Sequence, residues 1–447
     1  MNKKQNELFG TDPLGKLLQA QAIPASIGIL VMSIYGIVDT IFVGHWVGSL
    51  GIGAITVVMP ITFLISSIGM AIGVGGASII SRAFGENNEA KAYRTFGNQV
   101  ILTLSLSIFF LMLGIFFQES ILDAFGGKGD ILQPASEYFS IVLYGVPFLA
   151  WAMMSNNVIR AEGYPREAML TLVVPAVVNI VLDPIFIIGF EMGIEGAAWA
   201  TTLSYIASAT YTTWFFMRGK SQMKLTAKCI QPNLEIIQEI GAIGSVTLAR
   251  QGTISVLSIV LNNSLFVHGG EVALSSYGII NRVMMFANFP VLGITQGFVP
   301  ILGYNHGAKL FQRVKDLITL SIKSASFIAL GIFTLIMAFT PQLVSIFTNE
   351  TSLLAQAVPA LRKVFLATPL IAVNLIGSAY FQAIGKARPA LLLTLSKQGF
   401  FLIPLILLLP MYFGLDGVWY AFPIADVGAA LITYWYLKRE TAKIKVA

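Results

Sequence analysis

The feature that most limits the fold of this chain is a series of long apolar stretches. Each is long enough to cross a lipid bilayer as a helix, which takes about 20 residues. Backbone polar groups inside a bilayer must be satisfied within the protein, and a helix does this within each stretch. Only 11% of the residues are charged, whereas a soluble domain has about 25%. The sequence therefore predicts an all-α polytopic membrane protein with twelve transmembrane helices, near residues 17–43, 51–81, 95–117, 134–159, 167–190, 196–217, 236–267, 272–302, 317–340, 355–384, 388–412 and 415–437.

The placement of the basic residues predicts how these helices are oriented. The net charge is +6, and most Lys and Arg residues fall in alternate loops and near the two ends of the chain. The opposite loops, such as QESILDAFGGKGD and TNETS, hold most of the loop acids. Because basic residues concentrate on the cytoplasmic side of membrane proteins, we expect both termini in the cytoplasm and the protein in the cell (cytoplasmic) membrane. The charge thus indicates topology, and no nucleic-acid partner is expected.

The sequence also contains an internal repeat. The segments at 147 and 369, at 85 and 303, at 193 and 414, and at 39 and 263 resemble each other at nearly one spacing. Such spacing predicts two pseudo-symmetric six-helix bundles, residues 1–220 and 221–447, joined by the polar loop 218–233. Because six is even, the bundles are parallel repeats. Transporters built this way bind their substrates between the repeats and work by alternating access.

Two carboxylates stand inside apolar runs of the first half. An ionisable residue at this depth costs ~2.5–3.5 kcal/mol and is a functional candidate by default. Tyr35 lies one turn before Asp39, and Asn179 lies one turn before Asp183, so each pair shares a helix face. Together with Thr201 they form a candidate oxygen-rich site for one proton or one Na⁺, if the two carboxylates face one cavity.

Alternatives remain open for several of these polar groups. Asp183 precedes Pro184, and its role could be the purely structural one of capping a helix kink. Asn156 and Asn157, which are candidate substrate ligands, could instead join helices to one another.

The second half has lost these carboxylates. Asn263 stands in place of Asp39, Ile403 in place of Asp183 and Gly399 in place of Asn179. This favours a cation site confined to the first half. The second half has its own intramembrane charges, which either form a neutral Arg–Asp pair or bind substrate: Arg250, Arg282, Lys397 and Asp426.

At this point the chain resembles the MATE (multidrug and toxic compound extrusion) exporters of the MOP superfamily, of prokaryotic type. The resemblance covers nearly the whole chain and rests on IPASIG…VDTIFVGH, RAFGENNEAKAYR, NNVIRAEGYPREAM and NIVLDP. It implies two six-helix bundles arranged as a V around a central cavity. It also implies that Asp39, Asn179, Asp183 and Thr201 form the first-bundle cation site, with Tyr35 beside Asp39 and Asn157 nearby. One departure is that the segment PLIAVNLIGSAYFQAIG has no acidic residue, where some members of the family carry one. Glu239 lies only near the start of the seventh predicted helix.

These observations predict a secondary active exporter of cationic or amphipathic organic compounds, in antiport with H⁺ or Na⁺. We expect a monomer in the lipid bilayer, no enzyme activity, and no cofactor apart from the coupling ion. The residues expected to bind substrate are Tyr35, Asn156, Asn157, Arg250, Arg282 and Asp426. A flippase of the same superfamily for lipids or lipid-linked oligosaccharides is the rival, with Arg250 and Arg282 meeting anionic headgroups. A receptor or channel without transport activity is a third alternative.

Overall fold

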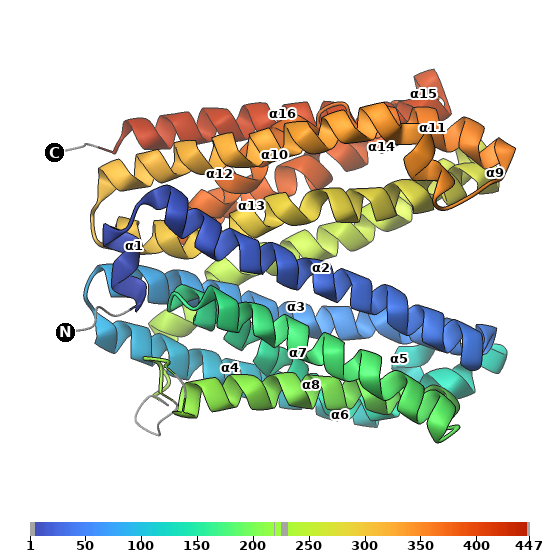
Figure 1. Ribbon diagram of the computed structural model, residues 1–447, viewed down its shortest axis with the longest axis horizontal. Coiled ribbons are helices and arrows are strands. Elements are labelled where there is room, and N and C mark those ends of the chain that lie inside the picture. The colour runs from blue at the N-terminus through green and yellow to red at the C-terminus, as the bar shows by residue number, and fades with distance from the viewer. Residues whose placement is uncertain (1–4, 219, 225–230, 445–447) are drawn as a thin grey trace. The chain divides into compact units, whose positions relative to one another are not determined.

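In the computed structural model, residues 5–218, 220–224 and 231–444 are described, and every regular element among them is a helix (Figure 1). The loop 218–233 that was expected to join the repeats lies partly outside these residues. The long elements of the first half of the chain are α2 (Leu14–Trp46), α3 (Ser49–Gly85), α4 (Glu89–Phe116), α6 (Leu132–Ala161), α7 (Pro165–Asp183), the π-helix η3 (Pro184–Gly189) and α8 (Gly193–Arg218). Those of the second half are α9 (Leu234–Gly307), α10 (Phe311–Ser345), α11 (Thr351–Phe365), α12 (Ile371–Ala383), α13 (Ala387–Leu395), the π-helix η6 (Ser396–Leu402), α14 (Ile403–Leu408) and α16 (Leu415–Ala442). Short elements complete the order: η1 (Gln5–Glu7), α1 (Leu8–Thr11), α5 (Gln118–Ala124), η2 (Gly129–Ile131), η5 (Thr368–Leu370) and α15 (Pro410–Phe413).

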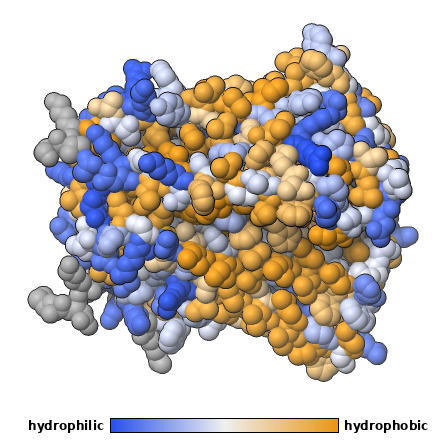
Figure 2. Space-filling view, turned by 45° about the horizontal axis from the view of Figure 1, so that its top comes forward, coloured by the Kyte–Doolittle hydropathy of each residue, from blue (hydrophilic) through white to orange (hydrophobic). Residues whose placement is uncertain are grey.

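The helices agree with the expected all-α membrane protein. Ten helical stretches of the described residues are long and apolar enough to cross a membrane. One of them, α9, has 74 residues and bends at Gly270, whose φ of 64° lies in the left-handed region, so it contains two crossings. The 26 residues of α8 are also long enough to span the bilayer core, which brings the number of spans to twelve. Apolar side chains fill the middle of the face in Figure 2, and hydrophilic ones gather toward its two ends.

The described chain packs as two compact units. One consists of Met1–Phe9 and Ile27–Thr247, and the other of Gly10–Ser26 and Leu248–Ala447. The sequence of α2 therefore contributes its first part to the second unit and its remainder, with Asp39, to the first unit. The start of α9 likewise belongs to the first unit.

In the first unit, α6 is the central helix and contacts α3, α4, α7 and α8. Glycine allows α3 to approach α6 closely, because a Cβ added at Gly69 would lie 2.7 Å from the backbone oxygen of Ala150. The core beside this contact contains buried aliphatic and aromatic side chains, among them Val58, Phe139 and Leu143. The tract GMAIGVGGAS therefore serves helix packing, as small residues do in membrane proteins.

In the second unit, α16 packs against α11, α12 and η6. Its buried Trp419 and Phe422 lie in a core with Phe365 and Ile280. Gly297 gives the first part of α2 a close approach to α9, because an added Cβ would lie 2.9 Å from the side chain of Gln21. Both units thus have a core of their own.

Outside the membrane spans, a buried acid holds part of the polar loop. Glu162 directly follows α6 and is fully buried. Ser221 Oγ donates to both of its carboxylate oxygens, at 2.7 and 2.9 Å, and the backbone N–H of Gln222 donates at 2.7 Å. Burial raises the pKa of the Glu162 carboxyl to about 7, against hydrogen bonds from Ser221, Gln222 and Met223 that lower it.

The first prediction concerns the close approach of α3 and α6. Gly69→Ala should lower the free energy of unfolding by about 1–3 kcal/mol, because the new methyl group meets backbone atoms that cannot rotate away. The melting temperature of the detergent-purified protein measures this. Gly241→Ala is the control, since nothing lies within 4 Å of a Cβ there. Equal melting temperatures for the two variants would contradict the packing described.

The second prediction concerns Glu162 and pH. An acid whose pKa is raised on folding, here from 4.5 to about 7, binds protons more tightly in the folded state than in the unfolded state. Its contribution to stability is therefore complete below about pH 4.5 and is lost as the pH rises toward 7. We expect the melting temperature of the wild type to fall more between pH 5 and pH 8 than that of Glu162→Gln. Parallel curves for the two proteins would exclude this role of Glu162.

Candidate functional site

The first unit gathers four of the predicted cation-site residues from three helices. Asp39 comes from α2, Asn179 and Asp183 from α7, and Thr201 from α8. All four side chains are buried, with exposed fractions of 7% for Asp39, 3% for Thr201 and 0% for the other two. Asn179 Nδ2 donates to Thr201 Oγ1 at 3.5 Å. Residues that are far apart in the sequence thus lie together in one buried cluster.

The two carboxyl groups of this cluster face each other. Asp39 and Asp183 lie close enough for their carboxyl groups to interact electrostatically. Among the described residues, none donates a hydrogen bond to either carboxylate oxygen of Asp183 or to Asp39 Oδ1, and Asn179 Oδ1 also accepts none. Two adjacent carboxylates in a low-dielectric site repel each other and cannot both remain charged without a partner. The arrangement therefore calls for a shared proton or a bound cation.

Asp183 lies at a change of helix type. It ends α7, and Pro184 begins the π-helix η3. Short π-helical turns within α-helices are frequent at functional sites, and proline removes a backbone donor at that point. The Asp183 side chain makes no capping hydrogen bond to η3, so it does not cap the kink in this structure.

Two tyrosines at this site were missed from the sequence. Tyr205 on α8 and Tyr138 on α6 lie near Asp39, as Tyr35 on α2 does. Tyr205 lies one helical turn after Thr201, which was a usable signal. Nothing in the local sequence distinguishes Tyr138 from other aromatic residues of the spans.

The asparagines proposed as substrate ligands lie elsewhere. Asn156 Nδ2 donates to the backbone oxygen of Ala168 at 2.6 Å and to Thr171 Oγ1 at 2.7 Å, and so joins α6 to α7. Asn157 Nδ2 donates within α6 to the backbone oxygen of Met153, and it packs over Gly73 of α3. Asn156 thus joins two helices as the alternative interpretation describes, whereas the hydrogen bond of Asn157 stays within α6.

In the second unit, Asp426 pairs with Lys397 of η6. The nitrogen–oxygen distance is 2.5 Å, and the Asp426 side chain is 5% exposed. The neutralising partner is thus a lysine, and not an arginine as the Arg–Asp interpretation proposed. Arg250 is half-buried and Arg282 is exposed. Glu239, at the start of α9, pairs with Arg82 at 2.8 Å in the first unit.

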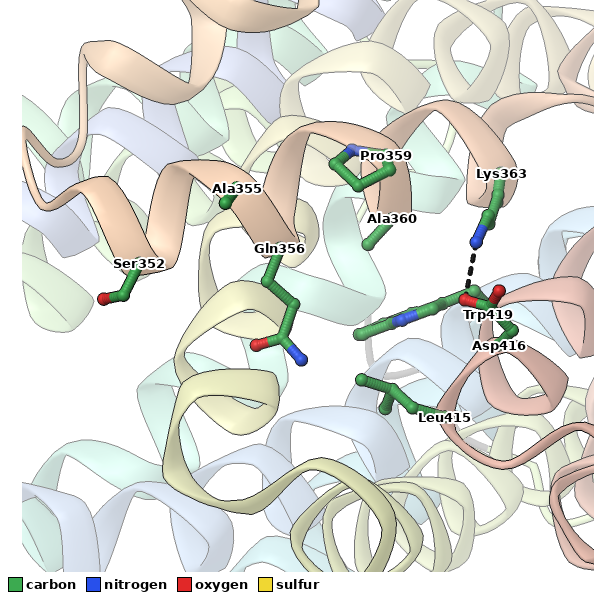
Figure 3. Close-up of a pocket in the computed structure, with 9 residues that line it drawn as sticks. All are labelled: Ser352, Ala355, Gln356, Pro359, Ala360, Lys363, Leu415, Asp416 and Trp419. Carbon is green, nitrogen blue, oxygen red and sulfur yellow. Dashed lines mark hydrogen bonds and ion pairs between the residues drawn. The ribbon is translucent and has the colours of Figure 1, made fainter.

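The pair of Asp426 is one of three along α16. Asp416, at its start, pairs with Lys363 of α11 at 2.5 Å (Figure 3). Glu440, near its end, pairs with Lys386. The pair with Lys363 borders a cavity of about 340 Å³, into which the Gln356 side chain also points (Figure 3). Each acid of α16 is therefore matched by a lysine of a neighbouring element.

No cluster of three or more His, Cys, Asp or Glu side chains suited to a metal occurs among residues 5–218, 220–224 and 231–444. The oxygen-rich group around Asp39 and Asp183 is a different kind of site, since amide and hydroxyl oxygens complete it. Hard cations such as Na⁺ bind to oxygen ligands of this kind.

Comparison with known proteins places this geometry in a family. The MatE family model matches residues 24–185 and again residues 247–408. The chain is 28% identical to the multidrug export protein MepA of Staphylococcus aureus over 445 residues, covering 99% of this chain and 98% of that protein. It is equally similar to MepA of Staphylococcus saprophyticus, at 28% over 446 residues with the same coverage.

Solved structures agree over the whole length. An outward-facing multidrug resistance MATE family transporter of the MOP superfamily superposes with a TM-score of 0.94 at 26% identity, over 99% of each chain. A MOP superfamily transporter from Pyrococcus furiosus, described by the reverse polarity of its binding pocket, superposes with a TM-score of 0.93 at 26% identity over 100% of each chain. The two family matches within one chain, the curated relatives and the shared fold together establish that this chain belongs to the MATE family of membrane transporters in the MOP superfamily and is not an enzyme.

Proposed function

We propose that the protein exports cationic or amphipathic organic compounds in antiport with H⁺ or Na⁺, by alternating access. The observation that carries this proposal is the pair of buried carboxyl groups of Asp39 and Asp183, to which the described residues donate too few hydrogen bonds. The relatives are named multidrug export proteins, which supports drug-like substrates. In this proposal the protein acts as a monomer in the cell membrane, with both termini in the cytoplasm.

The coupling ion would act by relieving repulsion inside the first unit. A proton shared by Asp39 and Asp183 would let their carboxyl groups stay together, and Na⁺ would do the same while also binding neutral oxygens. Asn179 Oδ1 accepts no hydrogen bond from the described residues, so it is available to such an ion, and Thr201 Oγ1 lies beside it. Because these groups come from α2, α7 and α8, ion binding would draw three helices together and ion release would let them separate.

The rival flippase function has a specific observation in its favour. Arg250 and Arg282 are basic groups within spans of the second unit, and basic groups could meet the phosphate of a lipid headgroup. That function does not by itself require a carboxyl pair in the first unit. Loss of coupled export on neutralising one carboxyl would therefore favour the antiporter.

The third prediction tests the carboxyl pair. In vesicles loaded with an organic cation dye, the wild type should exchange the dye under an imposed pH gradient or an imposed Na⁺ gradient. Asp39→Asn and Asp183→Asn should each lower this exchange at least tenfold, since neither leaves two carboxyl groups to hold the ion. Asp123→Asn is the control, because its side chain is 67% exposed and pairs with the exposed Lys128 outside the candidate site. Normal exchange by both core variants would refute the proposed coupling.

The fourth prediction separates the two coupling ions. Thr201→Val removes a neutral oxygen that Na⁺ would use and that a proton shared between carboxyl groups does not need. Exchange driven by a pH gradient should stay within about twofold of the wild type. Exchange driven by Na⁺ should need at least fivefold more Na⁺ for half-maximal rate. The idea fails if the variant loses pH-driven exchange while the protein remains folded.

A further inference from the structure

A cavity at one end of the second unit has no part in the proposed transport mechanism. It has a volume of about 340 Å³ and lies between α11 and α16 (Figure 3). Small-molecule sites have volumes of about 300–1,000 Å³ and combine an apolar wall with a few polar groups. The apolar wall here includes Leu415 and Trp419, which is 2% exposed. Four polar side chains complete the lining: Ser352, Gln356, Lys363 and Asp416.

This cavity lies at the end of the second unit that faces away from the C-terminus. Asp416 is in the first turn of α16, which is long and apolar enough to cross the membrane before it reaches the C-terminal residues. Two exposed tyrosines flank this end, Tyr412 of α15 at 81% and Tyr420 of α16 at 41%. Because tyrosine has an apolar ring and a polar hydroxyl group, it concentrates at the membrane–water interface. The cavity thus lies at the depth of the lipid headgroups.

The polar groups of α11 form one stripe along the helix. Ser352, Gln356 and Lys363 follow one another after four and seven residues, which places them on one face. Ala357 and Leu361, on another face, pack in the core of the unit. The helix begins at this end of the unit and runs inward. Lys363 is therefore nearest the membrane centre, and Gln356 lies about 10 Å of helix rise further out.

This stripe has hydrogen-bonding capacity to spare. Lys363 Nζ donates to Asp416 Oδ1 at 2.5 Å and lies 5.3 Å from the centre of the Tyr420 ring. An ammonium group has three donors, so one bond to Asp416 leaves others free. Gln356 Oε1 is buried and accepts no hydrogen bond from the described residues, and the side chain points into the cavity (Figure 3). Because a buried acceptor without a donor is destabilising, a ligand with N–H donors would stabilise it.

The charges of the cavity favour a ligand with one negative and one positive group. A lone anion would be attracted by Lys363 and repelled by the adjacent Asp416, whose side chain is 57% exposed, and the converse holds for a lone cation. A phosphate beside Lys363 and a primary ammonium beside Asp416 and Gln356 Oε1 would match all three groups. A quaternary ammonium has no N–H to donate and would leave the Gln356 acceptor unsatisfied.

A phospholipid presents these groups in the same order as the cavity. In a bilayer the acyl chains lie deeper than the phosphate, and the headgroup amine lies at or beyond it. Here the exposed Tyr420 is one turn deeper along α16 than Asp416, Lys363 stands at the level of Asp416, and Gln356 is further out.

We propose that this cavity binds the headgroup of a phospholipid that carries a phosphate and a primary ammonium, in the leaflet opposite the C-terminus. Lys363 binds the phosphate, Asp416 and Gln356 bind the ammonium, and the acyl chains pass Tyr420. The lipid thereby joins α11 to α16 at this end of the second unit. The proposal goes beyond the export function and does not depend on it.

Native mass spectrometry of the purified, delipidated full-length protein tests this site, because it resolves and counts bound lipids. The probes are phosphatidylethanolamine, phosphatidylcholine and phosphatidylglycerol with identical acyl chains, so that only the headgroup differs. The wild type should bind one phosphatidylethanolamine at least tenfold more tightly than either of the others. Gln356→Leu and Asp416→Asn should each lower this preference at least fivefold. Asp416→Asn should also strengthen the binding of phosphatidylglycerol, because it removes the repulsion of an anion.

A matched ion pair supplies the control. Lys386 pairs with Glu440 near the other end of α16, so Lys386→Gln should leave the lipid preference unchanged. Gln356→Leu should melt at the wild-type temperature, since Gln356 Oε1 accepts no hydrogen bond from the described residues, and this variant carries the test if Asp416→Asn fails to fold. The proposal is overturned if the wild type does not prefer phosphatidylethanolamine to phosphatidylcholine, or if Gln356→Leu keeps the preference of Lys386→Gln. Because no gradient is imposed, the result is separate from that of the vesicle exchange assay.

Discussion

Every charge that lies inside the bilayer must be matched by a partner, and this constraint shapes both units of the protein. The energy of an unpaired ion in hydrocarbon is too high for a fold to tolerate many of them. In the second unit, Asp426 near the middle of α16 has a lysine partner, and Asp416 and Glu440 near the ends of this helix are paired with lysines too. In the first unit, Asp39 and Asp183 face each other without an internal cation. The proposed coupling ion would supply the partner that the carboxyl pair lacks, whereas Asp426 already has one in Lys397.

The internal repeat shows that the two units have different buried polar groups at matched positions of the same fold. Aligning the segments at 193 and 414 puts Asp426 at the position of Tyr205, which lies near Tyr35 and Asp39 in the first unit. The second copy thus has an acid where the first has a phenol, and it has Ile403 where the first has Asp183. Its cation comes from Lys397, on the segment that corresponds to α7. Both copies have a π-helix in this span, but η3 follows Asp183 whereas η6 precedes Ile403, so the irregular turns lie on opposite sides of the matched position.

The sequence was sufficient for those features that depend on long-range periodicity. The membrane spans follow from the apolar runs, and the repeat and the family follow from matched segments. None of these features depends on how individual side chains pack. The sequence could also predict that Asp39 and Asp183 lie together. Each stands in the middle of an apolar run, where a carboxylate finds few polar partners other than another buried polar group.

The partners within the sites were harder to predict. The pairing of Asp426 with Lys397 instead of an arginine depends on how η6 is wound, and a π-helix turns its side chains away from the directions that an α-helical period assigns. The roles of Asn156 and Tyr138 depend on how α6 is rotated against its neighbours, which the sequence of one helix does not encode. Side-chain partners across helices are therefore the part that only the three-dimensional structure supplies.

The contrast between the units also bears on which helices can respond to an ion. Three ion pairs tie α16 to α11, to η6 and to Lys386 at the start of α13, and each must break before these elements can move apart. In the first unit, the residues that would bind the ion are distributed over α2, α7 and α8, and a long hydrogen bond from Asn179 to Thr201 joins α7 to α8 at that level. α2 and α7 also contain prolines, Pro24 and Pro175, where a helix can bend because a backbone hydrogen bond is already missing. Since α2 continues from the second unit into the first, a bend near Pro24 would move Asp39 while the preceding residues stay packed on α9. We therefore expect the binding energy of the coupling ion to act mainly on α2 and α7.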